Sequence, residues 1–428
     1  MTGIDWADIA ATYGTPTYVY DGDWLDEHLR GLRATLHPAL EVFFSLKSNP
    51  NRGVYDVLRA AGARAEVSSL AELATVRASG TDAADIVFLG PGKSPEEIAA
   101  CVDAGVYAII AESFAELDDI EAAARERGVR QRVLLRVNPA SSVSGSRLTM
   151  GGKPRQFGID EAQVLAGDAR LTSLPHVDVA GIQVYLGTRI LDPDVVVRNT
   201  EQILDLADRV AATCGIRLDA VDIGGGLGVA YFDGESDFDL TALAKDLNPL
   251  IDRFAATHPG TRLLMEAGRY LTALAGTYLM RVRYVKESMG ERFAVADGGT
   301  HHHMAAVGIG SFVKRNFPME LLSRPADGPL IPWTLTGPLC TPNDTVGKGV
   351  RLPELVPGDL IGVRRSGAYG PSASPGLFLS HGYPAEVMVR RGRTYLVRER
   401  DTVEDVLRAQ RTHPDLSFLT TSNCEEST

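Results

Sequence analysis

The sequence predicts a (β/α)8 barrel followed by an all-β domain. Short apolar runs alternate with helical patterns over roughly 240 residues, which is the expected length of such a barrel. From about residue 280 the helical patterns give way to strands and turns. The 428 residues are enough for this arrangement. We expect a barrel over 25–280, a β domain over 281–410 joined by an N-terminal strand within about 10–24, and a polar tail at 411–428.

Eight apolar runs have the length of strands that are buried in a parallel sheet. They span residues 42–48, 64–69, 85–90, 108–112, 132–138, 179–187, 220–224 and 262–267. Eight strands that alternate with helices are typical of a closed barrel.

Start and stop signals mark the helices between these strands. Three helices are expected to begin with a capping box, in which serine and glutamate side chains bind orphan amides: Ser69 with Glu72, Ser94 with Glu97, and Ser113 with Glu116. Four helices are expected to end at a glycine, as C-terminal caps do: Gly62, Gly80, Gly105 and Gly128.

The second half of the chain reads as strands separated by Gly/Pro turns. The segments are YLMRVRYVKE, RFAVADGG, LIGVRR and AEVMVRRGRTYLVRE. The early segment TPTYVYD, residues 15–21, is expected to add a strand to the same domain.

Composition and charge limit the function. Hydrophobic residues make up 44% and charged residues 23%, as in ordinary globular proteins. The formal net charge of −12 argues against nucleic acid or an anionic membrane as a general partner. No basic-then-apolar leader and no run of 18 apolar residues is present, so we expect neither a signal peptide nor a membrane span. The four cysteines lie far apart, which favours a reducing cytoplasm over disulfides or a CxxC metal site.

Chemically active residues cluster at the expected C-terminal ends of the barrel strands. A barrel enzyme places its reactive groups at this rim, whereas accidents of the core would be scattered. The rim residues are Lys47, Ser68, Arg136, Tyr185, Gly224, Gly225, Gly226, Gly228 and Glu266.

Lys47 ends the apolar run VFFSLKS. One interpretation is that its stem covers apolar surface while its amine reaches water. The other is that desolvation and nearby cations lower its pKa, so that the neutral amine can form a Schiff base.

Two glycine-containing loops follow adjacent strands. DIGGGLG and EAGRY can bring backbone amides, and one arginine, close to a phosphate. DIGGGLG does not fit GxGxxG, so a dinucleotide is a poor alternative. Glu266 needs a buried partner, and a protonated pyridine nitrogen would be one. A lysine that can form a Schiff base, two loops that can bind a phosphate and a carboxylate for the ring nitrogen together predict pyridoxal 5'-phosphate.

The segments FSLKSNPN, DIGGGLG, EAGRY, GPLCTPND and SGAYG resemble the fold-type III pyridoxal-phosphate decarboxylases. The resemblance implies a (β/α)8 barrel of the alanine-racemase type, as in diaminopimelate and ornithine decarboxylases. The resemblance runs from about residue 15 to 405, with the motifs in the family order. It implies a Schiff base on Lys47 and a ring-nitrogen contact from Glu266. It also implies phosphate contacts from Gly225, Gly226, Gly268, Arg269 and Tyr369.

The resemblance further implies an obligate homodimer with shared active sites. Cys340 of GPLC would be the acid–base residue and would reach into the partner's site. A buried small hydrophobe is the ordinary role of a lone cysteine, but the motif favours catalysis.

The departures from the family pattern concern the substrate. In QVYLGT, Tyr185 stands where a cofactor-stacking histidine is usual, and Thr188 is a further cofactor-binding candidate. The usual distal-end arginine is missing after Asp297, where HHHM follows. HHH, MGGKPRQFGID and ASPGLFLSH resemble the branch that includes the L-glutamyl-[acyl-carrier protein] decarboxylase of butirosin biosynthesis.

That branch implies an acidic aminoacyl thioester on an acyl-carrier protein: an aspartyl, 3-methylaspartyl or glutamyl group for antibiotic assembly. The substrate-binding candidates are Arg136, His302 and Asp344, and a basic rim for the carrier would comprise Arg147, Lys153, Arg155, Lys314 and Arg315, which could equally be a solvated surface. Three adjacent histidines on a strand would point to opposite faces, so we expect no metal.

Three alternatives remain open. One is decarboxylation of a free amino acid such as diaminopimelate, ornithine or lysine. Another is an amino-acid racemase, disfavoured because Cys340 stands where a tyrosine base would be needed. The third is a non-catalytic regulatory homologue, which should have lost cofactor residues.

Overall fold

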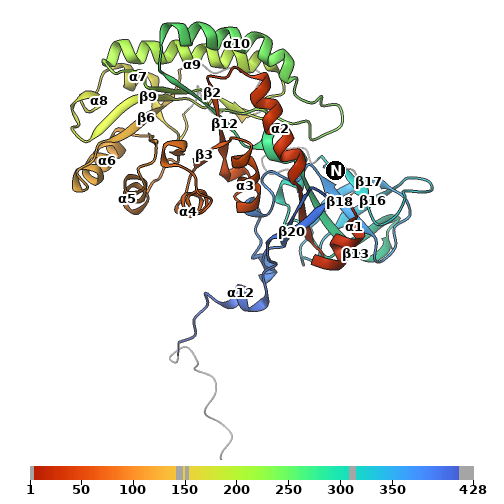
Figure 1. Cartoon of the computed structure of the whole chain (residues 1–428). Helices are drawn as coiled ribbons and strands as arrows, with labels where there is room; N and C mark the ends of the chain where they lie inside the picture. The colour runs from red at the N-terminus through yellow and green to blue at the C-terminus, as the bar shows by residue number, and fades with distance from the viewer. Residues whose placement is uncertain (1–3, 141–147, 150–153, 308–314, 414–428) are drawn as a thin grey trace, which may run out of the picture.

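The computed structural model describes residues 4–140, 148–149, 154–307 and 315–413 (Figure 1). A helix-wrapped barrel and a β domain lie next to each other, and the short helix α12 (Val403–Leu407) leads the chain away from both. Three carrier-rim candidates, Arg147, Lys153 and Lys314, lie outside the described residues, as does most of the expected tail.

The barrel is closed by eight parallel strands, which confirms the expected fold. Each strand pairs with the next one along the chain, and β12 returns to pair with β2. The strands are β2 (Leu40–Ser45), β3 (Arg64–Val67), β4 (Ile86–Phe88), β5 (Ala108–Ala111), β6 (Gln131–Asn138), β9 (Val177–Gln183), β11 (Ala220–Asp222) and β12 (Arg262–Ala267). Inward apolar side chains such as Phe43, Leu134 and Leu264 form a buried cluster, so the interior is a packed core.

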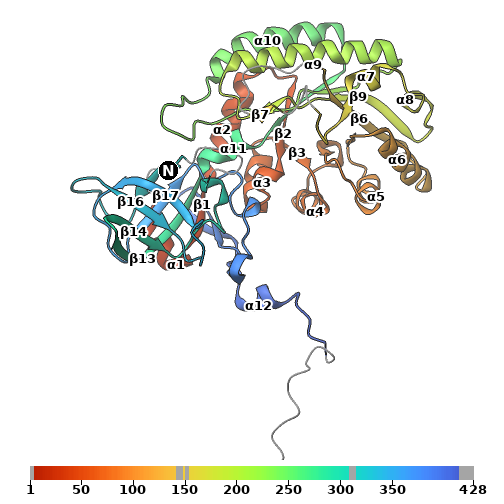
Figure 2. The same cartoon turned by 180° about the vertical axis from the view of Figure 1, so that it is seen from behind.

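Helices surround the barrel (Figures 1 and 2). They are α2 (Gly22–Thr35), α3 (Arg52–Ala60), α4 (Leu70–Ala78), α5 (Pro95–Ala104), α6 (Phe114–Glu126), α7 (Glu161–Leu165), α8 (Arg170–Ser173), α9 (Pro193–Cys214), α10 (Leu240–Thr257) and α11 (Arg269–Thr272). The short strands β7 (Leu148–Thr149), β8 (Ile159–Asp160) and β10 (Gly187–Thr188) lie in loops at the strand ends.

The expected helix caps are largely present. Ser94 and Glu97 form a complete capping box. Ser69 and Ser113 also accept the amide of the glutamate three residues on, but Glu72 and Glu116 bind an amide one residue earlier than expected, at Ser68 and Glu112. The four expected stop glycines all have positive φ, which only glycine adopts easily: Gly62, Gly80, Gly105 and Gly128.

The β domain is one mixed sheet of nine strands. These are β1 (Thr17–Asp21), β13 (Gly276–Ser288), β14 (Glu291–Ala296), β15 (Met319–Leu321), β16 (Ile331–Thr336), β17 (Thr345–Leu352), β18 (Leu360–Arg364), β19 (Ala385–Arg390) and β20 (Arg393–Arg398). The N-terminal β1 lies between β13 and β19, and α1 (Trp6–Tyr13) packs on this sheet through Trp6 and Ile9. The sequence analysis missed β15–β17, because Pro332 and two glycines interrupt the last two.

Two strands, β2 and β9, end three or four residues earlier than the sequence predicts. Strand β2 ends at Ser45, and the 3-10 turn η1 (Leu46–Ser48) follows, closed by the Asn49 amide on the Leu46 carbonyl at 2.9 Å. Strand β9 ends at Gln183, before Tyr185. Lys47 and Tyr185 therefore lie on turns over the rim and not inside the sheet.

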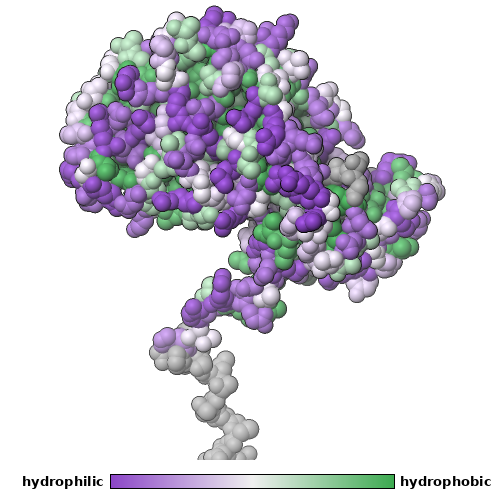
Figure 3. Space-filling model, viewed as in Figure 1, coloured by the Kyte–Doolittle hydropathy of each residue, from purple (hydrophilic) through white to green (hydrophobic). Residues whose placement is uncertain are grey.

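Hydrophilic residues cover most of the visible barrel surface, with hydrophobic ones scattered among them (Figure 3). Within the described part of the chain, no helix is both long and apolar enough to cross a membrane.

Candidate active site

Lys47 faces a buried carboxylate on the neighbouring strand. Its Nζ donates to both oxygens of Glu66, at 3.0 and 2.9 Å. The Glu66 side chain has no exposed area, while 37% of the Lys47 side chain remains exposed in the barrel mouth. Lys47 is thus an ion-paired amine that is reachable from solution, which is the position a cofactor-linking lysine needs.

The environment of Lys47 shifts its pKa opposite to the expected direction. Burial lowers the pKa, but the charges of Glu66 and Glu266 outweigh burial and leave it raised. The sequence analysis expected neighbouring cations, whereas the neighbours are anions. The amine is therefore an ammonium in this structure, and it must lose a proton before it can attack an aldehyde.

Three polar side chains form a buried group beneath Lys47. Glu266, on β12, accepts a hydrogen bond of 2.8 Å from Nε2 of Gln183, at the end of β9. Burial, reinforced by the charge of Glu66, raises the pKa of Glu266. Asp222 of β11 is fully buried beside Glu266, and its pKa is also raised by burial and by the Glu266 charge. A protonated ligand nitrogen beside these buried carboxyls would supply a positive charge and favour the ionised form of Glu266.

The glycines of the two loops lie against backbone that leaves no room for a side chain. A Cβ on Gly225 would be 1.9 Å from the Glu266 carbonyl oxygen, and one on Gly226 would be 2.1 Å from that of Gly187. At Gly268 a Cβ would meet Ser48 at 2.9 Å. These glycines let the loops after β11 and β12 pack tightly and expose their amides.

Arg269 supplies a half-buried cation next to Gly268. Its guanidinium donates to the Tyr231 hydroxyl at 3.0 Å and lies 4.6 Å from the ring centre of Tyr369. Its Nε is buried without a hydrogen-bond partner, and no ion pair joins it to a carboxylate within the described residues. A guanidinium whose buried Nε has no partner, next to glycine amides, fits a phosphate, so these residues suit pyridoxal 5'-phosphate.

Tyr185 and Thr188 lie at the same rim. A hydrogen bond links their side chains, and Lys47, Tyr369 and Glu266 all lie close enough to Tyr185 to influence its pKa, which burial raises. A neutral aromatic side chain next to Lys47 could stack on a cofactor ring, as the sequence predicts.

Arg136 is already engaged. Its Nη1 donates to Glu112 at 3.0 Å, both side chains are nearly fully buried, and its guanidinium lies 4.7 Å from the ring centre of Phe157. It is near enough to Glu266 to lower that pKa. Arg136 thus contributes positive charge to the site while its own carboxylate partner holds it in place.

Cys340 and Asp344 share a loop of the β domain but differ in exposure. Cys340 is exposed, whereas Asp344 is buried. Asp344 accepts the amides of Thr300 and Leu339, both at 2.8 Å, and the Thr300 hydroxyl at 3.0 Å. Asp344 therefore fixes the loop that presents Cys340, and its contact with substrate stays a prediction.

His302 is also fully engaged by the protein. Its ring nitrogens bond the Tyr278 hydroxyl at 3.2 Å and the Gly382 carbonyl at 2.8 Å, and the ring is buried in the β domain. Neither nitrogen is available to a substrate. Residues His301–His303 form a turn, so the argument that they alternate along a strand was wrong. No set of three metal-binding side chains gathers in the portion of the chain that the structure describes.

Two carrier-rim candidates can be placed. Arg155 is exposed. Arg315 bonds the Asp233 carbonyl at 3.1 Å and pairs with Glu235 at 3.4 Å, beside a pocket of about 600 Å³ that also includes Phe232 and Lys348.

This fold and site belong to a known family. Residues 24–273 match the family of the pyridoxal-dependent decarboxylases, in its pyridoxal binding domain. The chain belongs to this family and is a pyridoxal 5'-phosphate-dependent decarboxylase.

Relatives match almost the whole chain. It is 39% identical to the L-glutamyl-[BtrI acyl-carrier protein] decarboxylase of Niallia circulans over 97% of this chain and 99% of that protein. It is 34% identical to diaminopimelate decarboxylase of Pseudomonas aeruginosa over 94% of both chains. The diaminopimelate decarboxylase of Helicobacter pylori, solved with L-lysine, superposes with a TM-score of 0.85 at 25% identity, covering 94% of this chain and 98% of that one.

The sequence analysis did not single out Glu66, Asp222 or Gln183. Each had a visible signal, since each is a polar residue at a buried position within an apolar strand. Glu66 changes the chemistry most, because it decides the charge of Lys47.

Proposed function

We propose that this decarboxylase removes the α-carboxylate of an acidic aminoacyl group held as a thioester on an acyl-carrier protein. The group would be aspartyl, 3-methylaspartyl or glutamyl, and the product would serve antibiotic assembly. The observation that carries the proposal is the 39% identity, over 97% of the chain, to a decarboxylase of a glutamyl carrier protein. Diaminopimelate decarboxylases are less similar, at 34%.

The chain's residues have distinct roles in this proposal. Bound pyridoxal phosphate supplies an electron sink for the pair left on the α-carbon. Lys47 holds the cofactor through its amine and releases it to the substrate amine. As a carboxylate, Glu266 would keep a proton on the ring nitrogen, and the bond from Gln183 supports this ionised form because it lowers the pKa that burial raises. Arg269, with the amides of Gly225, Gly226 and Gly268, binds the phosphate, and Tyr369 covers it.

Glu66 has a role that follows from its contact. While it pairs with Lys47, it keeps the amine charged and oriented. Once Lys47 has given up its charge, Glu66 and Glu266 would repel each other at close range. A protonated ring nitrogen beside Glu266 would offset that repulsion.

Proton delivery to the α-carbon falls to Cys340. We propose that two copies of the chain form a dimer with shared sites, and that each exposed Cys340 enters the partner's barrel mouth. Its exposure and the rigid support from Asp344 favour this role.

The carrier would approach the barrel rim near Arg155 and Arg315. The chain is acidic overall, at −12, so these arginines would have to overcome repulsion from an acidic carrier locally. The widely spaced cysteines favour the cytoplasm as the place of reaction.

Decarboxylation of a free amino acid is the second candidate. The solved relative that contains L-lysine favours it. Racemization has no such support, and a regulatory homologue would not need the retained Lys47, Glu266, Arg269, Cys340 and Tyr369.

Mass spectrometry separates the two candidates. Carrier proteins loaded with aspartyl, 3-methylaspartyl or glutamyl groups are incubated with enzyme and cofactor, beside the free acids. Loss of carbon dioxide from a loaded carrier alone supports the proposal and identifies the acid. Decarboxylation of a free acid, with every loaded carrier unchanged, refutes it.

A further inference from the structure

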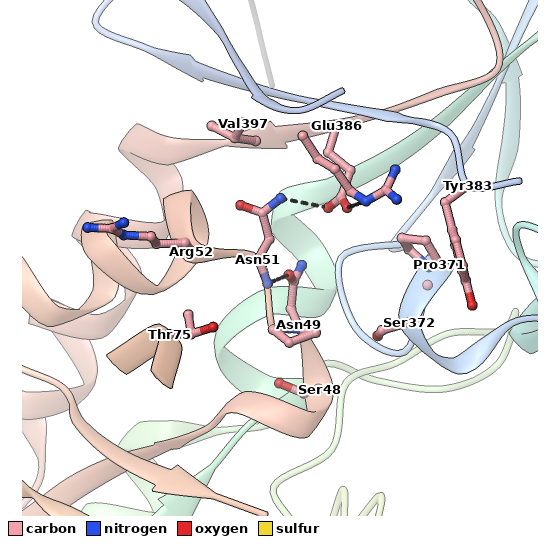
Figure 4. A pocket seen from close by; sticks show the side chains of 13 residues that line it. Ser48, Asn49, Asn51, Arg52, Thr75, Pro371, Ser372, Tyr383, Glu386 and Val397 are labelled. Carbon is pink, nitrogen blue, oxygen red and sulfur yellow. Dashed lines mark hydrogen bonds and ion pairs between the residues drawn. The ribbon is translucent and has the colours of Figure 1, made fainter. Parts of the chain in front are cut away.

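The turn that carries Lys47 runs directly into the junction between the barrel and the β domain. After η1, residues Asn49 and Asn51 line a pocket of about 390 Å³ with Pro371, Tyr383 and Glu386 of the β domain. Figure 4 shows the two asparagines between the barrel helices and the β-domain strand of Glu386.

Two hydrogen bonds join the Lys47 turn to the Tyr369 loop. The Tyr369 amide donates to the Ser48 carbonyl at 2.7 Å. The Asn49 side chain donates to the Gly367 carbonyl at 2.9 Å. The β domain is therefore hydrogen-bonded to the residues that directly follow Lys47. The bonds come from the same loop that places Tyr369 against Arg269.

A third connection ends at Glu386, on β19. Its Oε2 accepts Nδ2 of Asn51 at 3.0 Å and the Tyr20 hydroxyl at 2.7 Å (Figure 4 shows the first bond). Asn51 has two functions, because its Oδ1 also accepts the Gly53 amide at 2.8 Å and caps α3. Asn49 joins the chain of contacts, since its Oδ1 accepts the Asn51 amide at 3.1 Å.

Glu386 lies in an unusual place for an acidic residue. It is 5% exposed, and its nearest cation, Arg398, is 3.9 Å away. Burial raises its pKa, and the bonds from Tyr20 and Asn51 lower it. Both close donors are neutral, one from the β domain and one from the barrel. A buried carboxyl that bridges two parts of a protein fixes their geometry more than it adds stability.

We propose that Glu386 is a positioning residue for the cofactor site: by holding Asn51, and through it Asn49, it fixes the Lys47 turn against the Tyr369 loop. The inference rests on the decarboxylase site and not on the identity of the substrate.

The test compares Glu386→Ala with Glu386→Gln. The glutamine oxygen can still accept both bonds, whereas alanine leaves two buried donors unpaired. Affinity for pyridoxal phosphate is measured by titrating the visible absorbance of the lysine-linked cofactor. We expect Glu386→Ala to weaken cofactor binding at least about tenfold and Glu386→Gln to stay within about threefold of the parent.

Asp359→Asn is the matched control. Asp359 is a buried carboxylate of the same domain, with bonds to Ser323, Arg324 and the Val356 amide, all within that domain. Its change should lower the unfolding temperature and leave cofactor affinity unaltered.

Asn51→Ser keeps the test decisive if Glu386→Ala does not fold. Serine retains the helix cap and loses the donor to Glu386. We expect Asn51→Ser to weaken cofactor binding, and Glu386→Gln to add little further loss on that background. If Glu386→Ala or, failing that, Asn51→Ser binds cofactor like the parent, Glu386 is only structural and the proposal is overturned.

Discussion

Adding a methyl group at Gly225 tests how tightly the loop after β11, which is proposed to bind the phosphate, packs against the backbone of Glu266. In Gly225→Ala the new Cβ would lie 1.9 Å from the Glu266 carbonyl oxygen, where 3.0 Å is the shortest separation tolerated. The backbones of the two loops must therefore separate by at least 1.1 Å, the difference of those distances. Neither backbone moves easily, because the Glu266 amide is bonded to the Gly224 carbonyl at 2.8 Å.

Overpacking of this kind costs about 1–3 kcal/mol. For a barrel of this size the unfolding temperature should fall by roughly 2–10 °C. Since the separation moves both Glu266 and the phosphate-facing amides, cofactor affinity should fall by more than about tenfold. Thermal unfolding of the cofactor-free protein and absorbance titration with pyridoxal phosphate measure the two effects separately.

Gly31→Ala is the matched control. Gly31 lies within α2, has no positive φ, and a Cβ there would meet nothing within 4 Å. Alanine at this exposed helical position should stabilise by about 0.5–1 kcal/mol and leave cofactor binding unchanged. An unchanged unfolding temperature and unchanged cofactor affinity in Gly225→Ala would refute the steric reasoning.

Four further predictions follow from single contacts. Lys47→Ala should abolish turnover and the absorbance of lysine-linked cofactor. An active variant without that absorbance would refute the role of Lys47 as the residue that links the cofactor. Cys340→Ser should bind cofactor normally and lose most of its turnover, and mixing it with Lys47→Ala should restore up to about a quarter of the parent activity if sites are shared; no recovery after subunit exchange would count against sharing. Arg269→Ala should weaken cofactor binding about tenfold or more, measured by the same titration; equal affinity would exclude the phosphate contact. Burial lowers the pKa of His303 from 6.5 to about 4, so the stability it contributes is present above pH 6.5 and lost as the pH falls towards 4; His303→Asn should flatten this pH dependence of the unfolding temperature, and an unaltered slope would contradict it.

The sequence by itself determined the fold and the set of residues at the rim. Periodic apolar runs, serine caps and stop glycines are local signals, so all eight barrel strands were found within a few residues. The rim motifs were found because consecutive parallel strands bring their C-terminal ends to one face. Strands β16 and β17 were missed because their residues become a sheet only through pairing with distant partners.

Tertiary structure alone decided the electrostatics of the site. Lys47 and Glu66 are 19 residues apart, and only their neighbouring strands bring them into contact, which reverses the expected pKa shift of Lys47. Tertiary structure also decides the partners of His302 and Asp344. Their side chains form hydrogen bonds with Gly382 and Thr300, which lie 80 and 44 residues away in the sequence. A sequence shows which side chains can ionise or bond, but burial and distance set their charges, and both depend on which distant segments the fold packs together.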